Sequence, residues 1–452
     1  MLAESFEEFV ESLELDNQDD IDTKFRSITK RLNMSYYDGS ISEEDHGYKV
    51  GSLGRQTAIR GISDMDMLFV LPDSKYEQYD NYEGNGQSAL LQDVKKELRK
   101  RYSNEKIIVR GDGQVVVITF SNYEVEVCPA FENDDGSFTY PDSNEGGKWK
   151  RTDPLVEIGE SEYMIDHTNN HFKYICQMIR AWKNNIGFKM GGLLIDTLVH
   201  RFFGKYPAYV TATYEDYLPL FKDLFTYLKE QNKEQKYWRA LGSRQPVYDK
   251  HKTFISKAKK AYNKIKDLTK ESEEVYEKLQ EIFGIKFPVP ETVAKAELSS
   301  YAYRSVAVAG TEQFIEDKFK VDIKYSLKIE CEVSANGFRE GLLRTFIRTN
   351  KPLLLAKKLK FFIEKNEFKE KHRDMPLPFN IYWKVRNRGE EAINRNCIRG
   401  QIKEGTTQLE ESTSFMGGHF VECYIVSNGV CIARDRIDVP IFETPFAMKI
   451  KS

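Results

Sequence analysis

Two carboxylates stand one residue apart at the entrance to an apolar run of the sequence. In "GSLGRQTAIRGISDMDMLFVL", residues 51–71, Asp64 and Asp66 alternate with Met65 and Met67. Side chains at i and i+2 of a strand point to the same face, so both carboxylates share one face while the methionines face the core. Such close like charges repel unless a cation lies between them, and carboxylate oxygens suit Mg²⁺, with Mn²⁺ as an alternative. The pair therefore predicts a divalent-metal site.

A third carboxylate would complete a two-metal site for in-line phosphoryl transfer. The stretch "YEVEVCPAF" alternates strictly, with Tyr123, Val125 and Val127 on one face and Glu124 and Glu126 on the other. Glu126 is the candidate third ligand, and Glu124, which faces the same way, is a second carboxylate that could share the task.

A Gly-Ser pair precedes the two aspartates by about a dozen residues. Gly51 lets the backbone approach a triphosphate, and successive N–H groups with the Ser52 hydroxyl can hold its oxygens. Thr57 and Ser63 are further candidates for polar contacts with the nucleotide. With metal ions present, phosphoryl transfer leaves the protein mainly positioning and charge stabilisation. Taken singly, each of these motifs is also typical of an ordinary turn or strand entry.

The Gly-Ser pair, the Asp-x-Asp strand and the carboxylate strand running into "CPAF" resemble the nucleotidyltransferase fold of DNA polymerase β-type enzymes. More narrowly, they are similar to the bacterial cGAS/DncV-like nucleotidyltransferases. That family carries Asp where this chain has Glu126, followed by two apolar residues, Pro and Ala. The change adds one methylene and moves the carboxylate oxygens by over ~1 Å. The resemblance implies Asp64, Asp66 and Glu126 as catalytic metal ligands.

The segment "MIRAWKNN…MGGLLIDTLV" resembles the helical lobe of the same family, in which a basic residue near an "AW" element contacts the nucleotide. Arg180 and Lys183 are both candidates, and the sequence does not choose between them. Basic residues on a helix are more often part of a solvated face.

The C-terminal motifs "YWKVRNRGEEA", "RGQI" and "GGHFVECYIVSNGVCIARDRIDVPI" resemble the adenylyl/guanylyl and SMODS C-terminal sensor domain. The resemblance implies a nucleotide signal in bacterial anti-phage defence that acts on a separate effector protein. In this segment Arg386, Asn387 and His419 are candidate ligand contacts, and Trp383 is expected in the core or lining a groove. A basic, aromatic-lined groove there could stack a base of a nucleotide or nucleic acid.

These motifs need elements to position them. Apolar residues at three- and four-residue spacing predict two N-terminal helices, a helix over "ALLQDVKKELRKRY" and a helical region from about 166. We expect an α+β polymerase β-like palm over about 35–165 and a helical lobe over about 166–300, which includes the N-terminal helices. A β-rich sensor domain over 312–452 follows, with an Asn428-Gly429 hairpin.

Composition narrows the class of protein. The 452 residues are 40% hydrophobic and 30% charged, with a formal net charge of −3, so nucleic-acid binding needs a local basic surface. The sequence has no apolar run long enough to span a membrane and no signal-peptide pattern at its N-terminus. Six scattered cysteines predict neither a disulfide framework nor a zinc site. We expect a cytoplasmic protein without a membrane partner.

The leading hypothesis is a template-independent nucleotidyltransferase (EC 2.7.7 class) that joins NTPs or dNTPs into a cyclic or linear oligonucleotide signal. One alternative is a terminal transferase that extends an RNA or DNA 3′ end, which would depend on an added strand. Another is a non-catalytic nucleotide-binding protein, which would bind ATP tightly without turnover.

Overall fold

The computed structural model describes residues 1–61, 64–104, 107–121, 123–291, 293, 312–374 and 376–442, apart from the side chains at 390 and 393. The chain divides into two compact units. The first comprises Met1–Trp182 and Met190–Pro288, and the second comprises Lys183–Lys189 and Val289–Ser452. The predicted domain boundary between 300 and 312 lies outside the described residues, apart from 312 itself.

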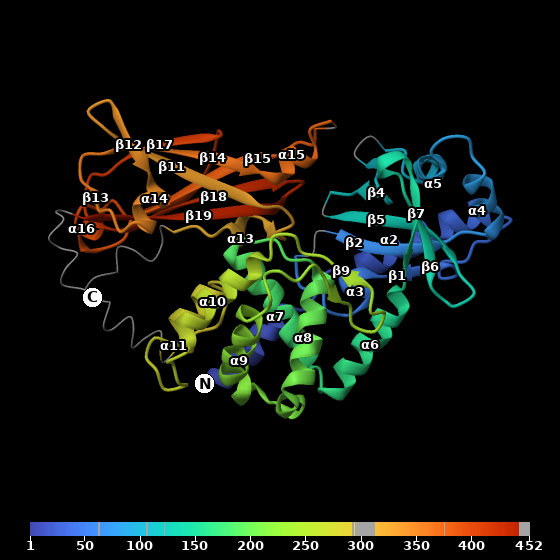
Figure 1. Cartoon of the computed structure of the whole chain (residues 1–452), viewed down its shortest axis with the longest axis horizontal. Coiled ribbons are helices and arrows are strands. Elements are labelled where there is room, and N and C mark those ends of the chain that lie inside the picture. Colours follow the sequence, from blue (N-terminus) through green and yellow to red (C-terminus); the bar gives the residue numbers. More distant parts are fainter. Residues whose placement is uncertain are drawn as a thin grey trace. The chain divides into compact units, whose positions relative to one another are not determined.

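A mixed sheet forms the palm of the first unit (Figure 1). Its central strands β2 and β5 run parallel, and their other neighbours are antiparallel. The strand order is β1 (Gly47–Lys49), β2 (Asp64–Val70), β5 (Glu124–Glu132), β4 (Val115–Thr119) and β3 (Ile108–Asp112), with β6 (Phe138–Asp142) paired to β5 and β7 (Lys148–Thr152) paired to β6. Short elements join these strands: α3 (Gly51–Gly54), α4 (Asp73–Asp80) and the 3₁₀ turn η1 (Asn144–Gly146).

Helices α2 (Gln18–Tyr36) and α5 (Gly86–Arg101) contribute to the apolar core on one face of this sheet. Met65, Met67, Val125 and Val127 lie in that core and are fully buried. The predicted alternation of β2 and β5 is therefore confirmed. Because side chains alternate along a strand, the carboxylates between these residues point to the opposite face of the sheet.

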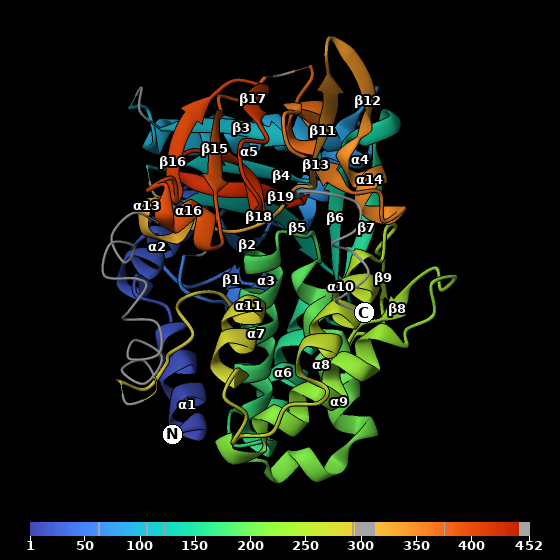
Figure 2. The same cartoon turned by 90° about the vertical axis from the view of Figure 1, so that its left-hand side faces the viewer.

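The rest of the first unit is helical, and α6, α8 and α9 run side by side in Figures 1 and 2. Its elements are α1 (Leu2–Ser12), α6 (Pro154–His167), most of α7 (His171–Ile186), α8 (Gly192–Lys205), η2 (Pro207–Thr211), η3 (Tyr214–Asp216), α9 (Tyr217–Lys229), the short pair β8 (Trp238–Arg239) and β9 (Pro246–Val247), α10 (Thr253–Ile265) and α11 (Val275–Phe283). Phe6 of α1 packs on Tyr217 and Phe221 of α9, so only the first N-terminal helix joins the lobe. The second N-terminal helix, α2, packs on the palm, because its apolar side chains belong to the core on one face of the sheet.

Two sheets form the second unit, and its apolar core draws on both. The first has the order β10 (Lys320–Val321), β19 (Val430–Phe442), β18 (Gly417–Ser427), β15 (Asn380–Arg386), β16 (Arg399–Gly405), with β13 (Leu353–Leu354) on β19. The second has the order β12 (Phe338–Leu342), β11 (Leu327–Ala335), β14 (Lys358–Asn366), β17 (Gln408–Ser412). Its short helices within the described residues are α13 (Ile315–Lys318), α14 (Leu343–Arg348), α15 (Glu367–Lys371) and α16 (Glu390–Asn394).

The predicted hairpin between β18 and β19 is confirmed. Asn428 and Gly429 both have positive φ, 49° and 73°, as a two-residue turn of this kind requires. The α+β fold class, with a mixed-sheet palm, a helical lobe and a β-rich C-terminal region, is likewise confirmed. Among the described residues, no helix combines the length and apolar character that crossing a membrane would require.

Candidate active site

Strand register brings the predicted carboxylates together. In the parallel pairing of β2 with β5, Asp64 is the partner of Glu124 and Asp66 is the partner of Glu126. Partners on neighbouring strands lie roughly 4.8 Å apart along the hydrogen-bonding direction. Four acidic side chains thus occupy one face of the two strands, opposite the apolar core.

Gly51 sits directly against one of these carboxylates. The residue follows β1 at the first turn of α3 and has a φ of +63°. The backbone N–H of Val50 donates to the carbonyl oxygen of Asp66 (3.0 Å), which ties the turn to β2. A Cβ atom on Gly51 would lie 2.8 Å from Cγ of Asp66, closer than real side chains approach one another. Glycine is therefore required here both by the backbone angle and by space.

Gly51, Asp66 and Glu126 line one pocket of about 230 Å³ on the site face of the palm. Cys128, the next residue on the same face of β5, lines it as well. Burial, together with the charges of Asp66 and Glu126, raises the pKa of the Cys128 thiol to about 12. The thiol is therefore protonated at neutral pH, and a protonated thiol is a poor nucleophile. Its raised pKa reflects the negative charge of the acids in this pocket.

The two glutamates of β5 have different surroundings. Glu124 accepts a hydrogen bond from the hydroxyl of Thr119 (2.7 Å) and lies 3.6 Å from the guanidinium of Arg110. Arg110 also pairs with Asp112 at 2.7 Å. Glu126, by contrast, lines the pocket with Asp66. This difference favours Glu126 over Glu124 as the third carboxylate of the site.

The chemistry of these side chains fits a hard divalent cation, because all four offer carboxylate oxygens. In the conformation observed, no group of three or more His, Cys, Asp or Glu within the described ranges is close enough together to hold a metal ion. Closure around an ion would therefore require rotation about the side-chain bonds of the acids, which have several accessible rotamers.

A buried ion-pair network lies beside the pocket. Asp196 of α8 is completely buried, and both of its carboxylate oxygens accept hydrogen bonds from Arg180 of α7, at 2.6 and 2.9 Å. Arg55 Nε and the Thr57 hydroxyl donate to the same carboxylate, each at 2.9 Å. Burial alone would raise the pKa of Asp196, but Arg180 and Arg55 lower it to about 2. The network joins the segment after α3 to the helical lobe.

Arg55 also lines the pocket, which makes it a candidate functional residue that sequence analysis did not single out. Its guanidinium lies 3.6 Å from Glu157 of α6, another lining residue. Burial raises the pKa of Glu157, and Arg55 opposes that shift. The sequence signal that could have identified Arg55 was a basic residue four positions after Gly51, close to the Gly-Ser pair.

The remaining predicted nucleotide contacts are placed as follows. Ser52 is half-buried in α3, and its carbonyl accepts the backbone N–H groups of Thr57 and Ala58. Asp64 begins β2, and Ser63 lies outside the described residues. Thr57 and Arg180 belong to the Asp196 network. These contacts remain predictions.

Lys183 belongs to the second compact unit, although it lies on α7. Its ammonium group donates to the carbonyl of Ile323 (3.0 Å) and lies 3.5 Å from Asp322. The neighbouring Asn184 bonds to the backbone of Val321 and Ile323. Of the two basic candidates, Arg180 is thus the one in the unit that carries the pocket.

In the second unit, Trp383 is buried and donates from Nε1 to the carbonyl of Thr406 (2.8 Å), as expected for a core residue. Arg386 pairs with Glu312 at 3.0 Å. Asn387 and His419 line a pocket of this unit. All six cysteines are free.

Two family models match the sequence. Residues 1–163 match the Second Messenger Oligonucleotide or Dinucleotide Synthetase domain. Residues 309–442 match the Adenylyl/Guanylyl and SMODS C-terminal sensor domain. Together these matches account for most of the chain. No curated protein matches it.

Several solved structures are similar at low sequence identity. CdnC of E. coli MS115-1, in a structure with ATP, is 15% identical, with 64% of this chain and 99% of that chain covered and a TM-score of 0.49. Apo DncV of Vibrio cholerae is 17% identical, with 54% and 69% covered and a TM-score of 0.44. The CdnE cyclic dinucleotide synthase of Elizabethkingia meningoseptica, with GTP and Apcpp, is 13% identical, with 58% and 98% covered and a TM-score of 0.42.

Proposed function

Because the chain belongs to the cGAS/DncV-like nucleotidyltransferases that carry an adenylyl/guanylyl and SMODS C-terminal sensor domain, we propose that it joins NTPs or dNTPs without a template into a short cyclic or linear nucleotide signal. The observation that carries the proposal is the cross-strand pair Asp66–Glu126, which shares a pocket with Gly51. Paired acids beside a glycine turn form a site suited to a cation and a triphosphate.

Asp64, Asp66 and Glu126 would hold Mg²⁺, or Mn²⁺, at the open face of β2 and β5. When bound, such ions activate an acceptor hydroxyl and stabilise the departing pyrophosphate. The protein's own part is to keep the three acids on one face. The register of β2 against β5 and the packing of Met65 and Met67 behind them do this.

Gly51, Ser52 and Arg55 would position the triphosphate. The absence of a side chain at Gly51 leaves room beside Asp66 for a phosphate oxygen to approach the backbone. Arg55 places a permanent positive charge in the lining of the same pocket. The Asp196 network orients that guanidinium, and Arg180 and Thr57 complete the network.

The direct test is pyrophosphate release by the full chain from each NTP and dNTP with Mg²⁺, followed by mass spectrometry of the product. We expect turnover with at least one nucleotide pair and a loss of roughly a thousandfold in Asp66→Asn, because removal of a metal ligand costs several kcal/mol in the transition state. Glu132→Gln, an exposed acid at the far end of β5, is the matched control and should keep full activity.

The same assay separates the alternatives. Activity that appears only with an added RNA or DNA strand would replace the proposal with a terminal transferase. Tight ATP binding without pyrophosphate release from any nucleotide would replace it with a non-catalytic nucleotide-binding protein.

A role in anti-phage defence rests on the family resemblance alone, and an effector protein would respond to the product. Plaque counts on bacteria carrying the gene with its neighbours, compared with the Asp66→Asn variant, test this role. Equal plaque counts with both forms would exclude it for the phages used.

A further inference from the structure

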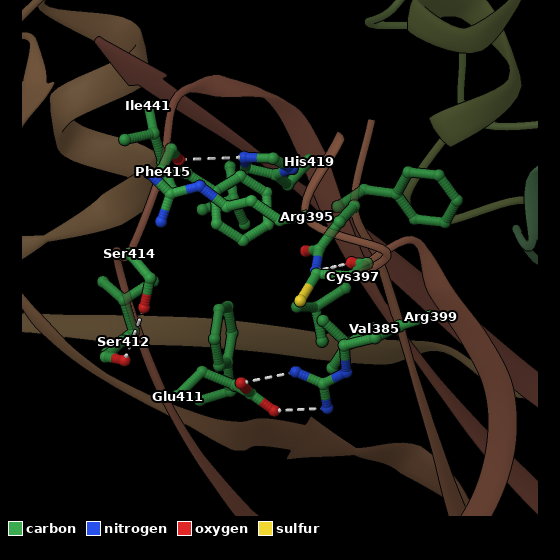
Figure 3. Close-up of a pocket in the computed structure, with 16 residues that line it drawn as sticks. Val385, Arg395, Cys397, Arg399, Glu411, Ser412, Ser414, Phe415, His419 and Ile441 are labelled. Atoms are coloured by element: carbon green, nitrogen blue, oxygen red, sulfur yellow. Dashed lines mark hydrogen bonds and ion pairs between the residues drawn. The ribbon is translucent and has the colours of Figure 1, made fainter. Parts of the chain in front are cut away.

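A second pocket, of about 290 Å³, opens between the two sheets of the sensor unit (Figure 3). Leu359 and Phe361 of β14 line it from the four-stranded sheet, and Val421 of β18 with Ile441 of β19 line it from the other sheet. These four residues also belong to the apolar core of the unit. The volume is close to the lower end for small-molecule sites, which suits a ligand the size of a mononucleotide or smaller.

Two aromatic rings line this pocket: Phe361, from β14 of the four-stranded sheet, and Phe415. Phe420 is also a lining residue, but its ring lies on the opposite face of β18 from Val421, which belongs to the core between the sheets. The loop that carries Phe415 is fixed by His419, whose Nδ1 accepts the backbone N–H of Arg388 (3.1 Å). The ring proton is therefore on Nε2, which donates to the carbonyl of Phe415 (3.2 Å), the bond drawn in Figure 3. A buried histidine thus holds the loop that presents Phe415, against which a planar ring could pack.

Two ion-paired arginines lie at the mouth of the pocket. Arg399, at the start of β16, forms two bonds to Glu411 of β17, at 2.7 and 2.8 Å, and this ion pair bridges the two sheets. The Arg399 side chain is 43% exposed, so the pair adds little to stability and its carboxylate can be exchanged for another anion at small cost. Arg395 also lines the pocket and pairs with Glu391 at 2.6 Å, with its guanidinium 5.6 Å from the centroid of the Phe415 ring.

The lining contains two arginines, and both are held in ion pairs, Arg399 with Glu411 and Arg395 with Glu391. A guanidinium whose carboxylate partner is exchanged can bind a phosphate in its place. An apolar, aromatic interior with guanidiniums at its mouth is complementary to a planar ring that carries an anionic group.

We propose that this pocket is a ligand site of the sensor unit that binds a nucleoside monophosphate. Its base packs against Phe361 and Phe415, and its phosphate takes the place of the Glu411 carboxylate on Arg399. This site lies wholly within the second unit and does not depend on the function proposed for the palm.

Cys397 supplies a reporter at the site. It lines the pocket, and its side chain is the exposed one among the six cysteines. The rate of Cys397 alkylation by a maleimide in the full chain therefore measures occupancy, and Cys397→Ser identifies the signal. Cys128 lines the palm pocket and Cys397 does not, so a nucleotide bound there contacts the neighbourhood of Cys128.

We expect millimolar AMP or GMP to slow Cys397 alkylation by about fivefold or more, the protection given by a ligand at several times its Kd. Adenosine and inorganic phosphate, each tested alone, should protect less, because each offers only half of the recognised groups. Absence of protection by AMP, GMP, CMP and UMP at 10 mM, well above the submillimolar Kd that fivefold protection by millimolar ligand implies, would overturn the proposal. Equal protection by phosphate alone would overturn the assignment of Phe361 and Phe415 as base contacts.

Three variants test the placement of the phosphate. Arg399→Gln should abolish protection, and Glu411→Gln should lower the half-protecting concentration about threefold to tenfold, because the competing carboxylate is gone. Lys403 is an exposed basic residue on the same strand as Arg399, and Lys403→Gln should leave the half-protecting concentration unchanged. Protection that survives in Arg399→Gln, with an unchanged melting temperature, contradicts the site.

Discussion

Gly51 and Asp66 approach so closely that no side chain can stand between them. Cγ and Cβ of Asp66 would lie 2.8 and 2.9 Å from a Cβ atom added to Gly51. The backbone bond from Val50 to the Asp66 carbonyl fixes the turn against β2, so the contact cannot open without loss of that bond. Gly51 and Asp66, the acid proposed to bind a metal ion, are thus parts of one small structure.

Gly51→Ala should abolish turnover while the protein remains folded. The methyl group displaces the Asp66 carboxylate, and the positive φ adds a backbone penalty of about 1 kcal/mol. Gly136→Ala is the matched control, since Gly136 has a φ of +78° and open space around it. Pyrophosphate release and thermal melting should show similar stability losses in both variants but loss of activity only in Gly51→Ala. Normal activity in Gly51→Ala would mean that the turn does not shape the site.

Glu124 and Glu126 of β5 should have different functions. Glu126→Gln should raise the Mg²⁺ concentration needed for half-maximal activity at least about tenfold, because a metal ligand is lost. Glu126→Asp, which restores the residue typical of the family, should remain active. Glu124→Gln should mainly lower the melting temperature, since Glu124 bonds to Thr119 and Arg110. Metal titrations of the three variants check this, and a larger metal effect in Glu124→Gln would reverse the assignment.

Cys128 should report cation binding without any turnover. Burial, with the charges of Asp66 and Glu126, holds its pKa near 12. A divalent ion bound by those acids offsets the contribution of their charges, so Mg²⁺ should lower this pKa and speed Cys128 alkylation at pH 9. The measurement uses the Cys397→Ser protein, and Asp66→Asn should blunt the response. An alkylation rate that Mg²⁺ leaves unaltered would argue against an ion at this position.

Asp196→Asn should destabilise the protein by roughly 3–5 kcal/mol, because it leaves Arg55 and Arg180 buried without their shared partner. Asp166→Asn, at an exposed position of α6, should change stability by less than about 0.5 kcal/mol. Urea unfolding followed by circular dichroism measures both. A small effect in Asp196→Asn would show that the network is not a stabilising link between the palm and the helical lobe.

The Asp196 contribution should also depend on pH in a defined direction. Its folded-state pKa, about 2, lies below the ordinary aspartate value of 3.8, so the ionised form favours the folded state. The contribution, about 2 kcal/mol, is fully present above pH 4 and is lost as the pH falls through about 2. The stability gap between wild type and Asp196→Asn should therefore narrow between pH 4 and pH 2. A constant gap over that range would contradict an ionised Asp196.

Local patterns were enough to predict much of the palm. The alternation of "DMDMLFV" and "YEVEVCPAF" assigns each side chain to one face of a strand, because the period of a strand is two. That period assigned Asp64 and Asp66 to one face of β2, and Glu126 to one face of β5. The Asn428-Gly429 pair predicted a hairpin, because a two-residue turn needs residues that adopt positive φ. Such patterns depend only on residues close together in the sequence, so they can be interpreted without knowledge of the tertiary fold.

Other features depend on which elements meet. The sequence offered Glu126 as the third ligand and left Glu124 able to share the task. The neighbours on β4 and β3 separate the two, since Thr119 and Arg110 engage Glu124. Arg55 and Asp196 are 141 positions apart, so no local pattern could pair them. Lys183 follows Arg180 by one helical turn, yet it bonds to residues 322 and 323. The sequence by itself determined the faces of the strands and the chemistry of the acids. The tertiary structure decided which charges meet, because a charge's partner is set by packing over long separations in the chain.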